Sequence, residues 1–424
     1  MKPILSWCLL LVPALVQASD WPQWRGPRND GIAPDKGVAL TWSAESNVRW
    51  KLAMPGMGSS TPCISKGKLF FTSQAGNDLV LLCVSTEGKE VWRRTLGQNK
   101  NKPRGDEGND ASASPSTDGQ HVYIFVGTGK MAAFDFEGKE VWSFNAQERY
   151  GRFRIQFGMH STPVLFQDRL YMQLIHSGGQ IVFAVDTKTG KEVWKINRES
   201  DGTDENEHSY ASCFLWRNGT EAYLVVHGND YATAHALEDG KEIWRVGDLN
   251  PRERYNRTLR LVASPVCTPE LIVVPSAKNG PVVGVKPNAQ GKVMRDSKYV
   301  QWRLSNGTPD VPSPLVYDGL VYLVGERGQL TVLDAKTGKE QYKKTLKPDR
   351  YRASPVVVEG HLIATAREGI FSVVKVGPTP SKILENKLPD RFTASPAFSD
   401  GVMYLRGHQY LWAIAANKES RPGS

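Results

Sequence analysis

The sequence lacks the features that mark several large classes of protein. No stretch after residue 18 is long and apolar enough to cross a bilayer as a helix, which argues against an integral membrane protein of that type. The formal net charge is +9, yet no block of five or more basic residues occurs. Scattered charge of this kind is typical of a solvated surface. The alternative is attraction to anionic lipid, polysaccharide or nucleic acid.

Cysteine is scarce and is not arranged as a redox or zinc motif. After residue 18 the chain keeps Cys63, Cys83, Cys213 and Cys267, each in an apolar run, and none forms C-x-x-C. Four cysteines allow three pairings, among which the sequence does not choose. Because a core of this size needs no covalent staples, we favour buried free thiols.

Common catalytic motifs are also missing. There is no G-x-S-x-G, no phosphate-binding glycine loop and no spaced pair of carboxylates. Histidines occur without H-x-H or H-E-x-x-H spacing, so no metal site is predicted. No catalytic residue can be named from the sequence.

The first eighteen residues are typical of a signal peptide. Lys2 gives a positive start, residues 4–16 are largely apolar, and Val16-Gln17-Ala18 offers small residues for cleavage. An uncleaved anchor is the alternative, whereas Cys8 lies inside the apolar run and is a poor lipoprotein cysteine. We therefore expect an exported protein, periplasmic or extracellular after cleavage near Ala18, and export argues against a nucleic-acid partner.

Turn residues are abundant instead, with Gly 39, Pro 26 and Trp 12, and a small-small-Pro signal recurs along the chain. Its copies are spaced by 53, 48, 50, 52, 49, 41 and 41 residues, enough for the four short strands of one propeller blade. We expect each copy to open an inner strand, where small residues fit the crowded axis and proline removes no ladder hydrogen bond. The copies end at Pro62, Pro115, Pro163, Cys213, Pro265, Pro314, Pro355 and Pro396.

A second signal, a glycine turn followed by an aromatic residue, alternates with the first. It reads EGKEVW, TGKEVW, DGKEIW or TGKEQY. The glycine suits a tight hairpin, and Lys-Glu keeps the outer, edge-like strand charged. We expect the aromatic side chains to pack between neighbouring blades and dock them together. These docking residues are Trp50, Trp92, Trp142, Trp194, Trp244, Trp302 and Tyr342.

The order of the two signals predicts an all-β, eight-bladed β-propeller. The eighth anchor is followed by enough chain for three strands, and residues 47–51 carry the missing aromatic strand. We therefore expect the N-terminal strand with Trp50 to complete the last blade, which leaves no exposed sheet edge. The expected divisions are a signal peptide at 1–18, an N-terminal extension packed on the propeller at 19–41, the propeller at 42–416 and a tail at 417–424.

The repeat resembles a known family. Residues 184–194 match the docking motif A-x-D-x-x-T-G-x-x-x-W, and residues 334–342 keep most of it. On these residues the chain resembles the PQQ-like repeat propellers of the quinoprotein alcohol dehydrogenase-like superfamily, including BamB-like envelope propellers, over about residues 42–416. Residues 20–27 are similar to the start of exported PQQ-like repeat proteins, and two tryptophans there predict that the segment lies against the propeller.

The resemblance points to two kinds of function. Quinoprotein dehydrogenases use PQQ and calcium with an adjacent Cys-Cys pair, which is missing here, and we cannot place a calcium site or a catalytic carboxylate by motif. PQQ and calcium are therefore possible cofactors that the sequence does not support. BamB-like proteins are usually lipidated, and this chain has no credible lipobox.

Loop lengths predict that one face carries any site. The connections into blades 2, 3, 4 and 5 span 23, 21, 19 and 21 residues from aromatic to anchor, against 12 or 13 in three of the others. Long loops on a rigid scaffold often bind ligands. The opposite face, with short turns, is expected to be plain scaffold. The candidate ligand- or partner-binding residues in the long loops are Arg104, Arg152, Arg154, His160, Glu207, His208, Tyr210, Arg254 and Tyr255.

Three interpretations of these polar loops stay open: ion pairs among the loops themselves, a site for an anionic or polyhydroxylated ligand, and a catalytic site. We favour a monomeric, non-enzymatic module that binds a protein or polysaccharide of the cell envelope through the long-loop face. The alternative is a divergent PQQ-dependent dehydrogenase with its site in the axial funnel.

Overall fold

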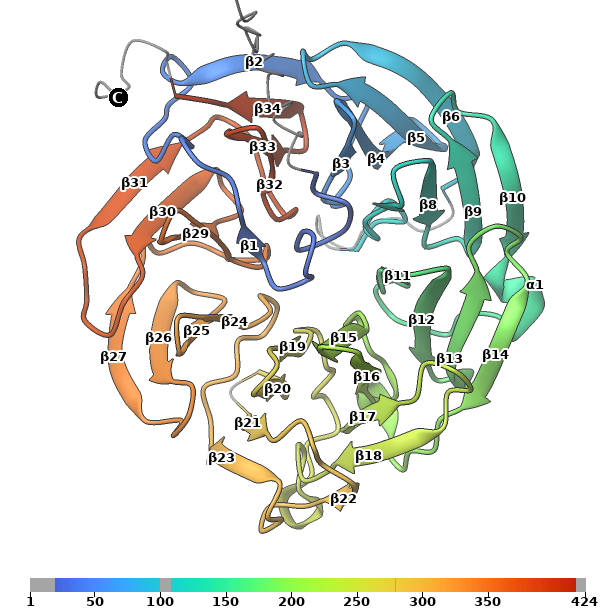
Figure 1. Cartoon of the computed structure of the whole chain (residues 1–424), viewed down its shortest axis with the longest axis vertical. Coiled ribbons are helices and arrows are strands. Elements are labelled where there is room, and N and C mark those ends of the chain that lie inside the picture. Colours follow the sequence, from blue (N-terminus) through green and yellow to red (C-terminus); the bar gives the residue numbers. More distant parts are fainter. Residues whose placement is uncertain (1–19, 100–107, 279, 417–424) are drawn as a thin grey trace, which may run out of the picture.

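Eight sheets of four or five strands radiate from a central axis in the computed structural model, which describes residues 20–99, 108–278 and 280–416 (Figure 1). This arrangement confirms the predicted all-β, eight-bladed propeller. The expected signal peptide with its cleavage site near Ala18, the candidate residue Arg104 and the tail 417–424 lie outside the described residues. No helix in the described part of the chain is long and apolar enough to span a membrane.

The first four blades each run from an inner strand to an outer strand in chain order. Their strands are β3 (Cys63–Ser65), β4 (Lys68–Ala75), β5 (Asp78–Ser85) and β6 (Glu90–Gln98); β7 (Ser116–Thr117), β8 (His121–Phe125), β9 (Lys130–Asp135) and β10 (Glu140–Asn145); β11 (Val164–Phe166), β12 (Arg169–His176), β13 (Gly179–Asp186) and β14 (Glu192–Asn197); and β15 (Phe214–Asn218), β16 (Glu221–Gly228), β17 (Tyr231–His235) and β18 (Glu242–Val246).

The last four blades follow the same plan, with additions from elsewhere in the chain. Their strands are β19 (Val266–Cys267), β20 (Ile272–Pro275), β21 (Val282–Val285) and β23 (Val300–Leu304); β24 (Leu315–Tyr317), β25 (Leu320–Val324), β26 (Gln329–Asp334) and β27 (Glu340–Thr345); β28 (Val356–Val358), β29 (His361–Thr365), β30 (Ile370–Lys375) and β31 (Ile383–Lys387); and β32 (Ala397–Ser399), β33 (Val402–Arg406), β34 (Tyr410–Ile414) and β2 (Val48–Ala53).

The middle strands of each blade are apolar on both faces because neighbouring blades cover both sides. In β4 and β5 six consecutive residues are buried, whereas most of the outer strand β6 is exposed or half-buried at the rim. The four cysteines of the described chain are free thiols, three of them buried and Cys267 partly buried. Cys83 lies in the buried run of β5, where burial raises its pKa to about 12. The core therefore consists of slabs between blades rather than one central cluster.

The last blade is closed by the N-terminal strand, as predicted. β2 pairs antiparallel with β34, with Trp50 opposite Ala413 and Ala53 opposite Tyr410. Figure 1 shows β2 at the outer rim beside β34. The outer edge of blade 8 is thus paired within the chain.

Outer-strand tryptophans dock each blade onto the next through the glycine turn. A Cβ placed on the turn glycine would lie 2.5–2.8 Å from the indole ring, so only glycine lets the ring lie on the turn. Each indole N–H also donates to a carbonyl of the same turn at 2.7–2.9 Å. The pairs are Trp50 with Gly88, Trp92 with Gly138, Trp142 with Gly190, Trp194 with Gly240, and Trp302 with Gly338.

Blade 5 departs from this pattern. Residues 286–299 leave the blade between β21 and β23, and β22 (Gly291–Val293) pairs in parallel with β18 of blade 4. Trp244 is paired with Gly291 of this added strand, packs edge-on against Tyr223 with ring centroids 6.1 Å apart, and is 1% exposed, so it is buried without a glycine turn against its ring. The excursion explains why the repeat that ends at Trp302 is degenerate in sequence.

The anchors are joined into a belt of hydroxyl groups around the axis. The residue before each anchor Pro or Cys is Ser or Thr, and in seven junctions its backbone N–H donates to the equivalent hydroxyl of an adjacent blade at 2.9–3.2 Å. The members are Thr61, Ser114, Thr162, Ser212, Ser264, Ser313, Ser354 and Ser395. These residues therefore recur both because they are small and because their hydroxyl groups accept hydrogen bonds from an adjacent blade.

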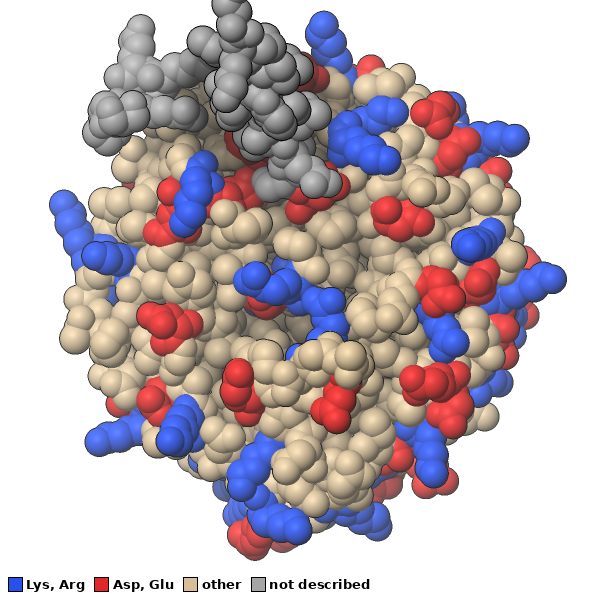
Figure 2. Space-filling model, viewed as in Figure 1, with Lys and Arg blue, Asp and Glu red and all other residues tan. Residues whose placement is uncertain are grey.

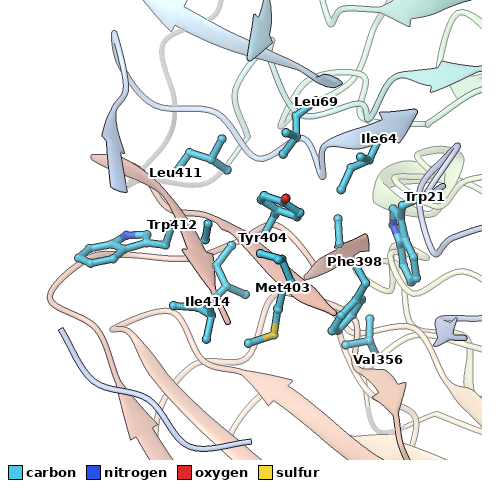
Figure 3. Packing of buried hydrophobic residues seen from close by; sticks show 14 of the residues in the cluster. Trp21, Ile64, Leu69, Val356, Phe398, Met403, Tyr404, Leu411, Trp412 and Ile414 are labelled. Atoms are coloured by element: carbon cyan, nitrogen blue, oxygen red, sulfur yellow. The ribbon is translucent and has the colours of Figure 1, made fainter. Parts of the chain in front are cut away.

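Residues 20–42 cross the face that carries the inner-strand turns. We call this the extension face, and the opposite one, with the long connections, the loop face. β1 (Ile32–Ala33) pairs in parallel with the inner strand β28. Trp21 is fully buried against Phe398, with ring centroids 5.4 Å apart, in the cluster around blade 8 (Figure 3). Backbone or side-chain hydrogen bonds join the extension to Ile64, Thr117, Leu165, Pro314, Val357 and Gly401.

The extension also supplies a tryptophan where the repeat has lost one. The outer strand of blade 7 carries Leu384 in place of an aromatic residue. Trp42 is buried against Phe371 of this blade, and its backbone N–H donates to Asn386 at 2.9 Å. The weakest repeat is thereby completed by a segment from the other end of the chain.

Candidate binding site

A pocket of about 220 Å³ opens on the loop face around the axis. The hydroxyl belt surrounds it, and Trp24 of the extension forms part of its lining. Trp24 packs edge-on against Phe214, with ring centroids 5.8 Å apart. The extension therefore contributes an aromatic side chain to the wall of the axial pocket.

The side chains above the belt differ from blade to blade. They come from the residue three positions before each anchor, and all eight line the pocket. In blade order they are Ser59, Ser112, His160, Tyr210, Val262, Val311, Arg352 and Thr393. The belt joins neighbouring blades with serine and threonine alone, whereas the varied side chains of this second layer give the pocket its chemical character.

One wall of the pocket is aromatic and uncharged. Tyr210 packs against Phe157 and His160, with ring centroids 5.8 and 5.7 Å away. Burial lowers the pKa of His160 to about 4, although a hydrogen bond to the Phe157 carbonyl opposes the shift. Burial likewise raises the pKa of Tyr210 to about 12. Both rings are neutral at physiological pH, and His160 Nε2 is buried without a hydrogen-bond partner.

Three guanidinium groups give the rest of the lining a positive character. Arg260 lies 5.0 Å above the Phe157 ring, and Arg352 and Arg367 come from blade 7. Each also meets a carboxylate that stands outside the lining, so the pocket wall is basic while the mouth is mixed in charge. The pairs are Arg260 with Glu205 at 3.0 Å, Arg352 with Glu326 at 3.2 Å, and Arg367 with Glu368 at 3.0 Å.

The third and fourth long loops are tied to each other beside this pocket. The third contains η1 (Asp204–Glu207) and the fourth η2 (Arg252–Arg254), and oppositely charged side chains join them. The Tyr255 hydroxyl donates to Asp230 at 2.5 Å and accepts the Thr203 N–H at 3.0 Å. The ion pairs are Arg252 with Asp201 at 2.6 Å, Arg257 with Asp204 at 2.5 Å, and Arg260 with Glu205 at 3.0 Å.

The candidate residues named from the sequence do not form one site. His160 and Tyr210 meet in the axial pocket. Arg152 and Arg154 are exposed on the second long loop, which also contains α1 (Ala146–Tyr150). Among the rest, His208 Nε2 lies 2.9 Å from Ser177 Oγ, the Glu207 carbonyl accepts from Gln180, Tyr255 braces the loops, and Arg254 lines a different pocket.

Sequence reasoning missed the basic part of the axial pocket. Arg352 lies within an anchor, and Arg367 lies in a short turn of blade 7, so loop length pointed away from both. A signal existed: position three before the anchor varies among eight otherwise similar repeats. The described chain contains no group of three or more His, Cys, Asp or Glu side chains placed to hold a metal ion.

Comparisons with solved structures show the same fold at low identity. BamB from Moraxella catarrhalis aligns with a TM-score of 0.60 and 11% identity, over 86% of this chain and 98% of that one. Quinohemoprotein alcohol dehydrogenase from Comamonas testosteroni aligns with a TM-score of 0.68 and 13% identity, over 96% and 82%. The computationally designed protein Ika8 aligns with a TM-score of 0.57 and 11% identity, over 86% and 99%. Such likeness establishes the fold and no function.

The sequence comparison is more specific. No curated protein matches the chain at a significant level. A family model described as outer membrane protein assembly factor BamB matches residues 32–195, 128–298 and 292–377. Because these matches together span most of the chain, the protein belongs to the family of PQQ-repeat propellers described as outer membrane protein assembly factor BamB.

Proposed function

We propose that this protein is an exported, non-enzymatic binding module that holds a protein of the cell envelope on its loop face. The observation that carries the proposal is the bracing of the third and fourth long loops by ion pairs and by Tyr255. A surface fixed before it meets its partner loses less conformational entropy on binding. The family's description as an assembly factor supports a protein partner over a polysaccharide.

The charge distribution on the loop face supports a specific partner surface over general adhesion to polyanions. The third and fourth long loops carry both signs of charge, and three of their arginines are paired with carboxylates. A mixed surface of this kind favours register and specificity rather than non-specific attraction. The opposite, extension face, which Figure 2 shows, also has basic and acidic side chains interspersed around its rim.

Site-specific photocrosslinking tests the proposal. A photoreactive residue at Arg152 or at Glu253 lies exposed on the loop face, and one at Lys188 lies exposed in a turn of the extension face. We expect the two loop positions to crosslink to the same envelope protein and Lys188 to give none of that product. Equal crosslinking from both faces, or none from either loop position, would refute the proposal. A monomer by light scattering is expected in the absence of the partner.

A PQQ-dependent dehydrogenase is the second candidate, because the axial pocket combines an aromatic wall with three guanidinium groups that suit a planar carboxylated ligand. Calcium prefers several carboxylate oxygens, and no carboxylate occurs in the described lining of the pocket. The donor set therefore does not match a calcium-bound quinone. A rise in melting temperature with PQQ and calcium, lost in an Arg352→Gln variant, would favour this candidate over the binding module.

A further inference from the structure

A second pocket lies between blades 4 and 5, at the outer part of the loop face, and shares no lining residue with the axial pocket. Its volume is about 420 Å³. The fourth long loop contributes Arg254, a turn of blade 5 contributes Lys278, and β23 contributes Arg303. Arg295 arrives with the excursion that carries β22. Four segments that are distant in the repeat thus each bring one cation to the same cavity.

Three of these cations have no carboxylate partner. Among the described residues, Arg254, Arg295 and Arg303 form no ion pair, whereas Arg252 and Arg257 of the same loop both do. Lys278 is shared with Glu326 at 3.5 Å, and no acidic side chain lines the pocket in the described part of the chain. The described lining therefore carries an excess of positive charge, which Glu326 and the nearby Asp248 carboxylate offset only in part.

Arg303 is the most constrained member of the group. Its side chain is half-buried, and it donates from Nη2 to the carbonyl of Asp248. The Arg295 N–H donates to the Asp248 carboxylate at 3.1 Å, so one residue holds both segments. Burial lowers the pKa of Arg303, with Arg295 and Arg254 adding repulsion and Asp248 opposing it. Like charges held together in a partly desolvated cavity are unfavourable until an anion enters.

The chemistry of the lining favours phosphate among anions. Guanidinium groups present pairs of N–H donors that match the oxygens of phosphate, and three of them can surround one group. A phosphomonoester carries about −1.5 to −2 charges near neutral pH and so compensates more of the cluster than a carboxylate can. The cavity also contains Leu259 and Pro281, which leaves room for a less polar portion of the ligand.

We propose that the pocket formed by Arg254, Lys278, Arg295 and Arg303 is a binding site for a phosphate-bearing ligand. Its source is either a phosphorylated small molecule or the head group of an anionic phospholipid, and both present the same oxyanion. The site does not depend on the partner proposed for the loop face.

Titration calorimetry with inorganic pyrophosphate tests the site directly. We expect the full-length parent to bind pyrophosphate, and the double variant R254Q/R295Q to bind at least tenfold more weakly. Both side chains are exposed, so the fold should tolerate the change. The matched control is R327Q, which removes an exposed arginine in a turn of blade 6 that lines neither pocket and should bind within twofold of the parent. Equal binding by parent and double variant, or no binding by the parent, would overturn the proposal.

A second measurement needs no ligand. In low-salt buffer, R254Q should melt at the same temperature as the parent or slightly higher, because the change removes only repulsion. A clear fall in melting temperature would show that Arg254 has a stabilising partner and would contradict the unpaired cluster.

Vesicle sedimentation then separates the two sources of phosphate. Parent protein that binds pyrophosphate and also sediments with phosphatidylglycerol vesicles, but not with phosphatidylcholine vesicles, would identify a lipid head group. Binding of pyrophosphate without sedimentation would identify a soluble phosphorylated ligand. In either case R254Q/R295Q should lose the signal and R327Q should keep it.

Discussion

At the scale of single residues, burial keeps three histidine side chains neutral in the folded protein. His227 is fully buried, and burial together with nearby Arg198 lowers its pKa to about 3. Burial also lowers the pKa values of His176 and His235 to about 4. All three lie in blades 3 and 4, with His176 and His227 near the loop face and His235 beside the glycine turn at Gly240. A histidine in water takes up a proton near pH 6.5, so these residues bind protons more readily in the unfolded chain.

Stability should therefore fall as the pH drops. The contribution of each buried histidine is complete above about pH 6.5 and declines toward the folded-state pKa, because protons then favour the unfolded state. For His227 the difference between pH 7.5 and pH 5 is about 2 kcal/mol. Between pH 7.5 and pH 5 we expect the free energy of unfolding of H227Q to fall by about 2 kcal/mol less than that of the parent, as measured by urea unfolding. H361Q, at a partly exposed position, should follow the parent, and an unchanged slope in H227Q would contradict the assignment.

At the scale of the element, the glycine turn and the tryptophan of the preceding blade act as one unit. The positive φ of the glycine makes the hairpin, and the absence of a side chain lets the indole lie on it. The same glycine thus supplies both the positive φ of the turn and the space for the indole ring, which accounts for its recurrence in five blades.

Two glycine substitutions separate these needs. Gly190 has φ +65° and would place a Cβ 2.5 Å from Trp142, whereas Gly219 has φ +60° and nothing within 4 Å. Alanine imposes similar backbone strain, of order 1 kcal/mol, at both sites. We expect G190A to be destabilised by roughly 1–3 kcal/mol beyond G219A in chemical denaturation, because overpacking adds to the strain. Equal losses would mean that the blade interface yields easily.

The sequence predicted those features of the structure that recur in several blades. Anchors and glycine turns repeat, so their copies revealed the blades, their order and the closing strand with Trp50. Residues that act only once gave no such signal. Arg295 reaches its pocket because β22 leaves blade 5 for blade 4, a step that no local pattern encodes. Likewise, Arg352 belongs to an anchor whose next residues join the blades, so the repeat pattern indicates a structural role for it. Only its position, three residues before the proline, marks it as a residue of the pocket lining.

At the scale of the whole molecule, the ring is closed by pairs that are very far apart in sequence. Val48 lies opposite Ile414, and Gly31 accepts a hydrogen bond from Val357. These contacts replace the two free edges that an open set of blades would expose to other chains.

Removing the closing strand should open the ring. We expect deletion of residues 42–51, which removes Trp42 and most of β2, to lower the melting temperature strongly and to expose blade 8 to limited proteolysis. Deletion of the tail 417–424 is the control and should leave both readouts unchanged. A 42–51 deletion that melts like the parent would show that β34 does not need its partner.

The contacts of the extension and β2 also constrain the order in which the chain folds. Most of their hydrogen-bonding partners lie between residues 314 and 414, so the first ordered residues of the chain are among the last to find their places. Contacts over such separations form slowly because the loop must close before they contribute. During synthesis, the N-terminal strands therefore cannot pair until nearly the whole polypeptide has been made. Until they pair, an intermediate with seven complete blades would expose an unpaired strand edge.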